Sequence, residues 1–140
     1  MSKRCVVVRR GEESEGTTGV TYAEGVSAST TGARGLCLEL ATLPPGARAR
    51  AHVHAEHESA AYVLEGELLL WFGEKLQERL IARAGDFIYI PGGVPHLPAN
   101  ASATEPAIAV LARTDANEQE SAIPLPALDA LPHLHEEASR

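Results

Sequence analysis

Cysteine is scarce in this chain of 140 residues, which has only Cys5 and Cys37. The two lie far apart in sequence and fit neither a disulfide framework nor a zinc site built from thiolates. We therefore expect reduced thiols, with Cys37 packed as a small apolar side chain. A positively charged leader followed by an apolar stretch is also lacking, and no apolar run approaches membrane-spanning length. These absences predict a cytoplasmic protein.

Basic residues are few as well. Lys and Arg number 12 against 19 Asp and Glu, which gives a formal net charge of -7 at pH 7. Nucleic acids and anionic membranes bind clustered Lys and Arg, whereas the basic residues of this chain are scattered. The composition therefore argues against both as main partners. The length suits one compact domain that can bury a sizeable core.

Short runs of β-favouring residues, separated by glycine and proline, follow one another along the chain. The leucines that alternate over 36–43 predict a half-buried strand. Val6-Val7-Val8 predicts a short edge strand, and the following stretch to Thr31 is expected to form loops. Further strands are expected over 60–72, with a turn at Glu65-Gly66, and over 76–82, 87–90 and 107–112. This spacing is typical of an all-β barrel or jelly roll.

His52 and His54 stand two residues apart. In an extended strand such residues project from the same face, so both imidazoles can converge on one point. The turn at Pro91-Gly92-Gly93 brings a third imidazole, His96, back toward them. Three neutral imidazoles with an oxygen or a water suit a divalent ion such as Fe, Mn, Ni, Cu or Zn, and the ligand set does not choose among these metals.

The two histidine-bearing segments together resemble the cupin family. Its first motif is Gly, five residues, His-x-His, three or four residues, Glu, six residues, Gly; its second is Gly, five residues, Pro-x-Gly, two residues, His, three residues, Asn. Gly46, His52, His54 and Gly66 match the first, and Gly85, Pro91, Gly93, His96 and Asn100 match the second. The resemblance covers about residues 34–113. It implies a double-stranded β-helix, the cupin jelly-roll barrel, in a single domain over 1–140, with a strand and loop over 1–33 and a tail over 114–140.

The fourth ligand is less certain in this sequence, because the position at which cupins usually carry a glutamate holds Ser59. Glu58 satisfies the motif's three-residue spacing from His54. His57 instead has the strand parity of Ser59, so a regular strand points it inward and a bulge would favour Glu58. The three histidines alone are the remaining possibility. The candidate metal ligands are thus His52, His54, His57, Glu58 and His96.

Two further groups of residues stand near or outside the motifs. Arg48 and Arg50 share the strand parity of the first two histidines, so they are either clamps for an anionic group at the pocket rim or solvated arginines. His133 and His135 form a second His-x-His, expected to lie in a solvated terminal segment. An apolar stripe, laid on the barrel or on a second subunit, is predicted by Leu125, Leu128, Leu131 and Leu134.

The cupin resemblance implies a metal in the barrel mouth that acts on a small molecule. Three histidines without a firmly placed carboxylate look most like the cupin dioxygenases that hold iron through imidazoles. Sugar-phosphate isomerases of similar fold must hold an anionic phosphate, which suits this acidic chain less well. No catalytic residue is assigned: Tyr62 and Tyr89 are expected to be structural, and Ser59 lacks the context that activates a serine nucleophile.

Two non-catalytic hypotheses are considered together with these enzyme classes. The chain is either a cupin that binds a small molecule or senses a metal without turnover, or a structural barrel that holds no metal. Fold alone does not choose between them. Because cupins commonly dimerise, the resemblance also implies a homodimer.

Overall fold

The computed structural model describes residues 3–16, 18–117 and 121–134 of the chain. These residues form eleven strands and two short helices. The strands are β1 Glu13–Glu15, β2 Thr21–Val26, β3 Cys37–Leu43, β4 His52–Val53, β5 Ser59–Glu65, β6 Glu67–Phe72, β7 Glu78–Arg83, β8 Phe87–Ile90, β9 His96–Asn100, β10 Ala107–Arg113 and β11 Ile123–Pro124. The helices are α1 Ala28–Thr31 and α2 Pro126–Asp129. No helix in this part of the chain has the length and hydropathy needed to cross a lipid bilayer.

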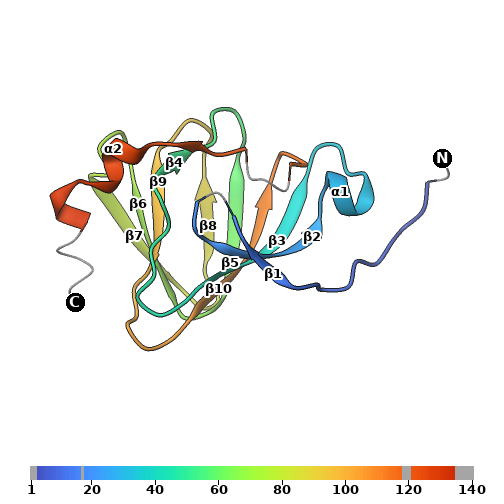
Figure 1. Ribbon diagram of the computed structural model, residues 1–140, viewed down its shortest axis with the longest axis horizontal. Coiled ribbons are helices and arrows are strands. Elements are labelled where there is room, and N and C mark those ends of the chain that lie inside the picture. The colour runs from blue at the N-terminus through green and yellow to red at the C-terminus, as the bar shows by residue number, and fades with distance from the viewer. Residues whose placement is uncertain (1–2, 17, 118–120, 135–140) are drawn as a thin grey trace.

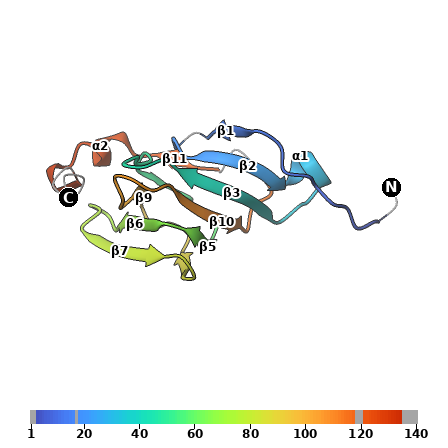
Figure 2. The ribbon, with the colours of Figure 1, turned by 90° about the horizontal axis from the view of Figure 1, so that it is seen from below.

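Two antiparallel sheets form the body of the protein. One has the strand order β1-β2-β3-β10-β5-β8 and the other the order β11-β4-β9-β6-β7. Figures 1 and 2 show them as two layers, with β6 and β7 on the opposite side of the molecule from β1 and β2. Strands distant in sequence lie side by side, as in the pairing of β10 with both β3 and β5. Such long-range pairing is typical of a jelly roll. The predicted all-β double-stranded β-helix is therefore confirmed.

Most of the expected strands are present close to their predicted bounds. β8 covers 87–90, β10 extends one residue beyond 107–112, and the run 60–72 is the hairpin of β5 and β6. The strand expected over 76–82 begins later, at Glu78, because the turn after β6 continues through Leu76, whose φ is +50°.

Gly66 makes the turn of the β5–β6 hairpin. Its φ is +77°, a left-handed conformation that L residues adopt at a cost. A Cβ atom at this position would also lie 2.3 Å from the carbonyl oxygen of Pro106. Glycine is thus required here both by the backbone conformation and by the close approach of another segment.

The prediction for the N-terminal segment is wrong. Val6-Val7-Val8 forms no strand, and Val6 and Val7 are 63% and 74% exposed. A β-branched run favours a strand only where it packs against a neighbouring strand. Conversely, the stretch to Thr31 that was expected to be loops contains β1, β2 and α1. β2 pairs with β3 and buries Tyr22, which explains why this segment is ordered as a strand.

β3 forms where the alternating leucines predict a strand, but its faces are reversed. Leu38 is 42% exposed, whereas Cys37 and Glu39 are buried. The buried thiol agrees with the expectation for Cys37. The carboxylate of Glu39 is tolerated inside because Arg113 of β10 lies beside it, and a buried charge needs such a partner.

The core extends to both faces of the five-stranded sheet. Leu70 of β6 packs inside with Val63 and Ile88. Its neighbour Trp71 belongs to a different cluster, as expected for side chains that alternate across a strand. That second cluster is covered by the C-terminal tail: Leu134 is 1% exposed, and three further leucines pack against it, namely Leu125, Leu128 and Leu131. The predicted stripe therefore lies on the barrel of its own chain.

The tail histidine His133 is packed as well, so the expectation of a solvated segment is wrong for it. Its Nε2 donates to the carbonyl oxygen of Leu76 at 2.8 Å, and its ring centroid lies 5.1 Å from that of Trp71. The leucines on either side hold this segment against the sheet. His135 lies outside the described residues.

Candidate metal centre

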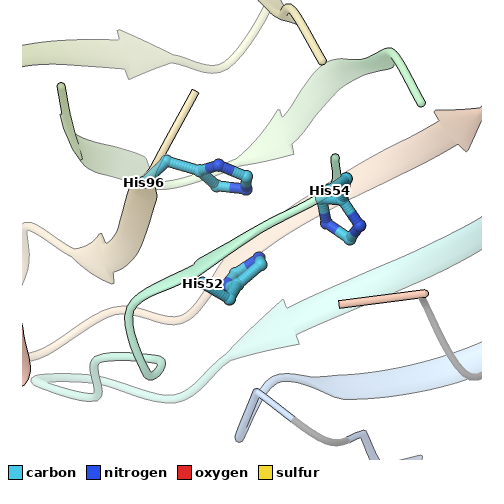
Figure 3. Close-up of side chains that lie close together, drawn as sticks. All are labelled: His52, His54 and His96. Atoms are coloured by element: carbon cyan, nitrogen blue, oxygen red, sulfur yellow. The ribbon is translucent and has the colours of Figure 1, made fainter. Parts of the chain in front are cut away.

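Three histidines gather at one end of the barrel interior. His52 begins β4, His54 follows that strand by one residue, and His96 begins β9. Figure 3 shows their rings close together, with His96 approaching from a different strand than the other two. The ring centroids are 5.1 Å apart for His52 and His54, 4.3 Å for His52 and His96, and 5.5 Å for His54 and His96. One ring nitrogen from each lies within 4.8 Å of the others. The sequence thus brings together the three imidazoles that its spacing predicted.

The backbone holds the two motifs against each other. His52 of β4 is the direct antiparallel partner of His96 of β9. On the far side of the first motif, the N–H of Gly93 donates to the carbonyl oxygen of His54 at 2.9 Å. Gly93 has φ +79°, as the sequence predicted for this turn. These two main-chain contacts, the β4–β9 pairing and the Gly93 hydrogen bond, therefore place His96 beside the other two rings.

Hydrogen bonds set the tautomers of two of the rings. Nδ1 of His52 lies 2.7 Å from the carbonyl oxygen of Arg50, and Nδ1 of His96 lies 2.9 Å from that of Val94. A carbonyl oxygen only accepts, so Nδ1 carries the hydrogen in each ring and Nε2 keeps a lone pair. Metal-binding histidines are commonly oriented by such a bond from the other ring nitrogen. The donor set fits a divalent metal.

Burial keeps these rings uncharged. It holds the pKa of His52 far below the usual 6.5, at about 3, and the nearby His96 lowers that pKa further, while the bond to the Arg50 carbonyl acts in the opposite direction. Burial also lowers the pKa of His96. At neutral pH both imidazoles are neutral, which is the form that binds metals.

The three rings open onto a cavity of about 90 Å³ between the sheets. Most of its wall is apolar and comes from both sheets, with Leu70 and Ile88 among the contributors. The polar side chains that line it are few: the three histidines, Tyr22, Ser59 and Arg113. The described wall contains no Asp or Glu. A small and largely apolar ligand matches this lining.

His57 and Glu58 lie outside the histidine cluster. Nε2 of His57 is 3.9 Å from Oδ2 of Asp115, and its side chain is 34% exposed. Glu58 is exposed and accepts a hydrogen bond of 2.6 Å from the hydroxyl of Tyr89. The buried Ser59, at the position where the family motif has its glutamate, lines the cavity. The part of the chain that the structure describes therefore offers three converging ligands.

The two candidate arginines do not line the histidine cavity. Arg48 donates through Nη2 to the carbonyl oxygen of Asp129 at 2.8 Å and lines a different cavity, beside Trp71. Arg50 is exposed. Residues 49 and 50 lie outside β4, so strand parity counted back from His52 does not predict the facing of either arginine.

Sequence reasoning missed Arg113, the one arginine among the residues that line this cavity. It is the last residue of β10, and the inward positions of that strand are Ala107, Ala109, Leu111 and Arg113. The alternation of inward and outward residues could have found it, had the strand been extended by one residue. The charge of Arg113 is among the causes that lower the pKa of His52.

Asn100, the last residue of the second motif, has a structural task. Its Nδ2 lies 3.1 Å from the carbonyl oxygens of Leu43 and Pro44 and 2.7 Å from that of Glu105. Its Oδ1 accepts from the N–H of Ser102 at 2.8 Å. The buried amide thus joins the end of β3 to the loop that follows β9.

The sequence profile of the cupin domain matches residues 39–112, which is more than half of the chain. The same stretch contains both motifs and all three clustered histidines. This protein belongs to the cupin family. No curated protein gave a significant match to the chain.

Solved structures with the same fold support this assignment. A protein of Klebsiella pneumoniae described as having a double-stranded β-helix domain is 20% identical, with a TM-score of 0.60 over 70% of this chain and 78% of that one. A predicted oxalate decarboxylase of Thermotoga maritima is 20% identical, with a TM-score of 0.59 over 69% and 80% of the two chains. An oxalate oxidase is 21% identical, with a TM-score of 0.63 over 88% and 69%. At these identities the likeness shows the fold alone.

Proposed function

We propose that this cupin binds a divalent transition metal through His52, His54 and His96 and uses it to act on a small molecule in the adjoining cavity. The observation that carries the proposal is the convergence of three buried ring nitrogens within 4.8 Å of one another at the wall of that cavity. Such a metal supplies Lewis-acid or redox chemistry to a ligand beside it. Fe, Mn, Ni, Cu and Zn all suit three imidazoles.

Among enzyme classes, a dioxygenase-type reaction fits the cavity better than an isomerisation. An isomerase moves protons with a positioned acid or base; with the three histidines assigned to the metal, Tyr22 is the one remaining candidate among the described residues of the cavity wall. The same observation favours the second candidate, a non-catalytic cupin that binds its ligand at the metal. Consumption of dioxygen by the iron-loaded protein, tested across oxidisable small molecules, separates the two.

The metal itself is tested by elemental analysis of protein purified without an affinity tag. We expect near-stoichiometric metal in the wild type and its loss in the double variant His52→Ala, His96→Ala. His57→Ala and Glu58→Ala are matched controls that should keep the metal, because both residues lie outside the cluster. Negligible metal in the wild type would contradict the proposal. Loss of metal in either control would instead restore that residue as the fourth ligand.

Three further expectations complete the proposed function. The chain acts as a single domain, in the cytoplasm, and as a homodimer. With the leucine stripe of the tail laid on its own barrel, the exposed aromatic residues Phe87 and Tyr89 of β8 offer a surface for a second copy. Light scattering coupled to size-exclusion chromatography measures the oligomeric state, and a monomer at all protein concentrations would exclude the dimer.

A further inference from the structure

Arg113 stands on the wall of the histidine cavity although almost no solvent reaches it. Its side chain is 1% exposed. In the strand register it lies between Cys37 of β3 and Ser59 of β5. Arginine is rarely buried to this extent unless its charge and its N–H groups have partners. The partners of this guanidinium therefore indicate what it is for.

The protein satisfies only part of the guanidinium. Nη1 lies 3.7 Å from Oε2 of Glu39, a distance that balances charge but is too long for a good hydrogen bond. Nη2 donates to the carbonyl oxygen of Asn117 at 3.0 Å and lies 3.6 Å from Sγ of Cys37. Burial and the Glu39 carboxylate raise the pKa of that thiol to about 12, so the cysteine is uncharged. The buried Nε has no hydrogen-bond partner within the described part of the chain.

The charges around the cavity favour an anionic ligand. Imidazoles that bind a metal are neutral, and the ion pair of Glu39 and Arg113 has no net charge. Ser59 contributes a hydroxyl, and no carboxylate lines the described wall. A divalent metal at the histidines would therefore bring two positive charges into an apolar cavity that has no anion to balance them. Buried charge is costly without a partner.

We propose that Arg113 is a binding residue that anchors the carboxylate of a small acid held at the histidine centre. The inference rests on the proposed function and names its substrate class. A ligand carboxylate would accept a charge-assisted hydrogen bond from the guanidinium and offset the metal charge. The remainder of the acid would pack against the apolar wall. The cavity, of about 90 Å³, suits a small acid.

A purely structural Arg113 makes a different prediction. It would brace β10 against β3 and the Asn117 carbonyl, and its loss would lower stability without regard to which ligand is present. An anchoring Arg113 instead controls the preference for a carboxylate over an uncharged group of the same shape. The ratio of two binding constants distinguishes the roles, because a general loss of stability leaves that ratio unchanged.

The probes are isobutyrate and isobutyramide, which share a shape and differ in charge. Their affinities for the zinc-loaded protein are measured by calorimetry, with zinc content determined in every sample. Removal of Arg113 alone would leave the buried Glu39 charge unpaired and risks unfolding. The test variant is therefore the double change Glu39→Gln, Arg113→Met. Arg113→Lys keeps the charge and loses the planar fork. Arg48→Met is the matched control, since Arg48 lines a different cavity.

We expect the preference for isobutyrate to fall about tenfold or more in the double variant, the size expected for one charge-assisted hydrogen bond. The Lys variant should fall between the two, and the Arg48 control should match the wild type. An unchanged ratio in a folded, zinc-loaded double variant, or binding of neither probe by the wild type, would overturn the role of Arg113. Failure of the wild type to take up zinc would contradict the proposed function instead. The same ratio, measured on that metal-free protein, then decides the role of Arg113 by itself.

Discussion

His52 and His96 are direct cross-strand partners, and their ring centroids are 4.3 Å apart. The pair joins the two motifs, and the two histidines are separated by more than forty residues of chain. Because β4 is only His52–Val53 and pairs with β9 at one position, few main-chain bonds hold it in the sheet. The geometry of the metal centre and the stability of β4 are consequently coupled, and the pH dependence of stability should report on both.

Acid should destabilise the metal-free protein through these histidines. The pKa of His52 is about 3 in the folded protein against 6.5 ordinarily, so below pH 6.5 the unfolded chain takes up a proton that the folded protein refuses. Stability is therefore full above about pH 6.5 and falls as the pH drops toward 3, by up to about 1.4 kcal/mol per pH unit for His52 alone. His96 acts in the same direction.

The measurement is urea denaturation of chelator-treated protein at several pH values below neutral. His52→Gln should flatten the pH dependence, since glutamine does not titrate. An equal slope in this variant and the wild type would show that His52 is not protonated preferentially in the unfolded chain.

Asn100→Ala should destabilise the fold by roughly 2–4 kcal/mol, because the carbonyl oxygens that this buried amide joins would lose their donor. The amide nitrogen of Asn100 lies within 3.1 Å of the carbonyl oxygens of Leu43, Pro44 and Glu105, and the bond to Leu43 is buried. Chemical denaturation measures the change. The control is Asn117→Ala at an exposed site, which keeps the main-chain carbonyl that Arg113 uses. Equal costs at both sites would refute a special role for the buried amide.

Two glycines with nearly the same backbone conformation allow the cost of a left-handed conformation to be measured apart from the cost of a close contact. Gly66 has φ +77° and Gly46 has φ +71°. A Cβ at Gly66 would meet the Pro106 oxygen at 2.3 Å, whereas nothing lies within 4 Å of one at Gly46. We expect Gly46→Ala to cost about 1–2 kcal/mol from the left-handed conformation, and Gly66→Ala to cost clearly more. Thermal unfolding of the two variants compares them directly, and similar melting temperatures would contradict the contact.

Leu134→Ala should cost about 2–5 kcal/mol, the range for a leucine removed from a packed core. The side chain is 1% exposed and joins the cluster of Trp71 and Leu97. Leu64→Ala is the control, since Leu64 is 45% exposed. Denaturant titrations give both values, and a small effect at Leu134 would mean that the tail adds little to the fold.

The sequence predicts the barrel and the histidine cluster well because both depend on local rules. Alternation places strands, glycine and proline place turns, and the His-x-His spacing puts two rings on one face. The fourth ligand was beyond these rules. The parity argument for His57 holds only inside a strand, and β5 begins at Ser59. His57 instead turns toward Asp115, and Glu58 toward Tyr89.

The other differences arise from partners that lie far away in sequence. Glu39 faces inward because Arg113 lies beside it and balances its charge. Nothing in the sequence near either residue indicates this pairing. Val6-Val7-Val8 has the composition of a strand without a neighbouring strand among the described residues. Whether a segment pairs as a strand, and which of its side chains face inward, therefore depends on tertiary contacts. The cytoplasmic location, the single domain and the homodimer remain predictions.

The packing of the tail also sets the order in which this protein can mature. Leu134 closes a core cluster whose other members lie in the segment 51–99. A ribosome delivers residue 134 only after every strand of both sheets has left it, so until then the nascent chain exposes the apolar side of β6 and β9. Such an interval favours association between unfinished chains. This cluster can therefore complete its folding only after residue 134 has emerged from the ribosome.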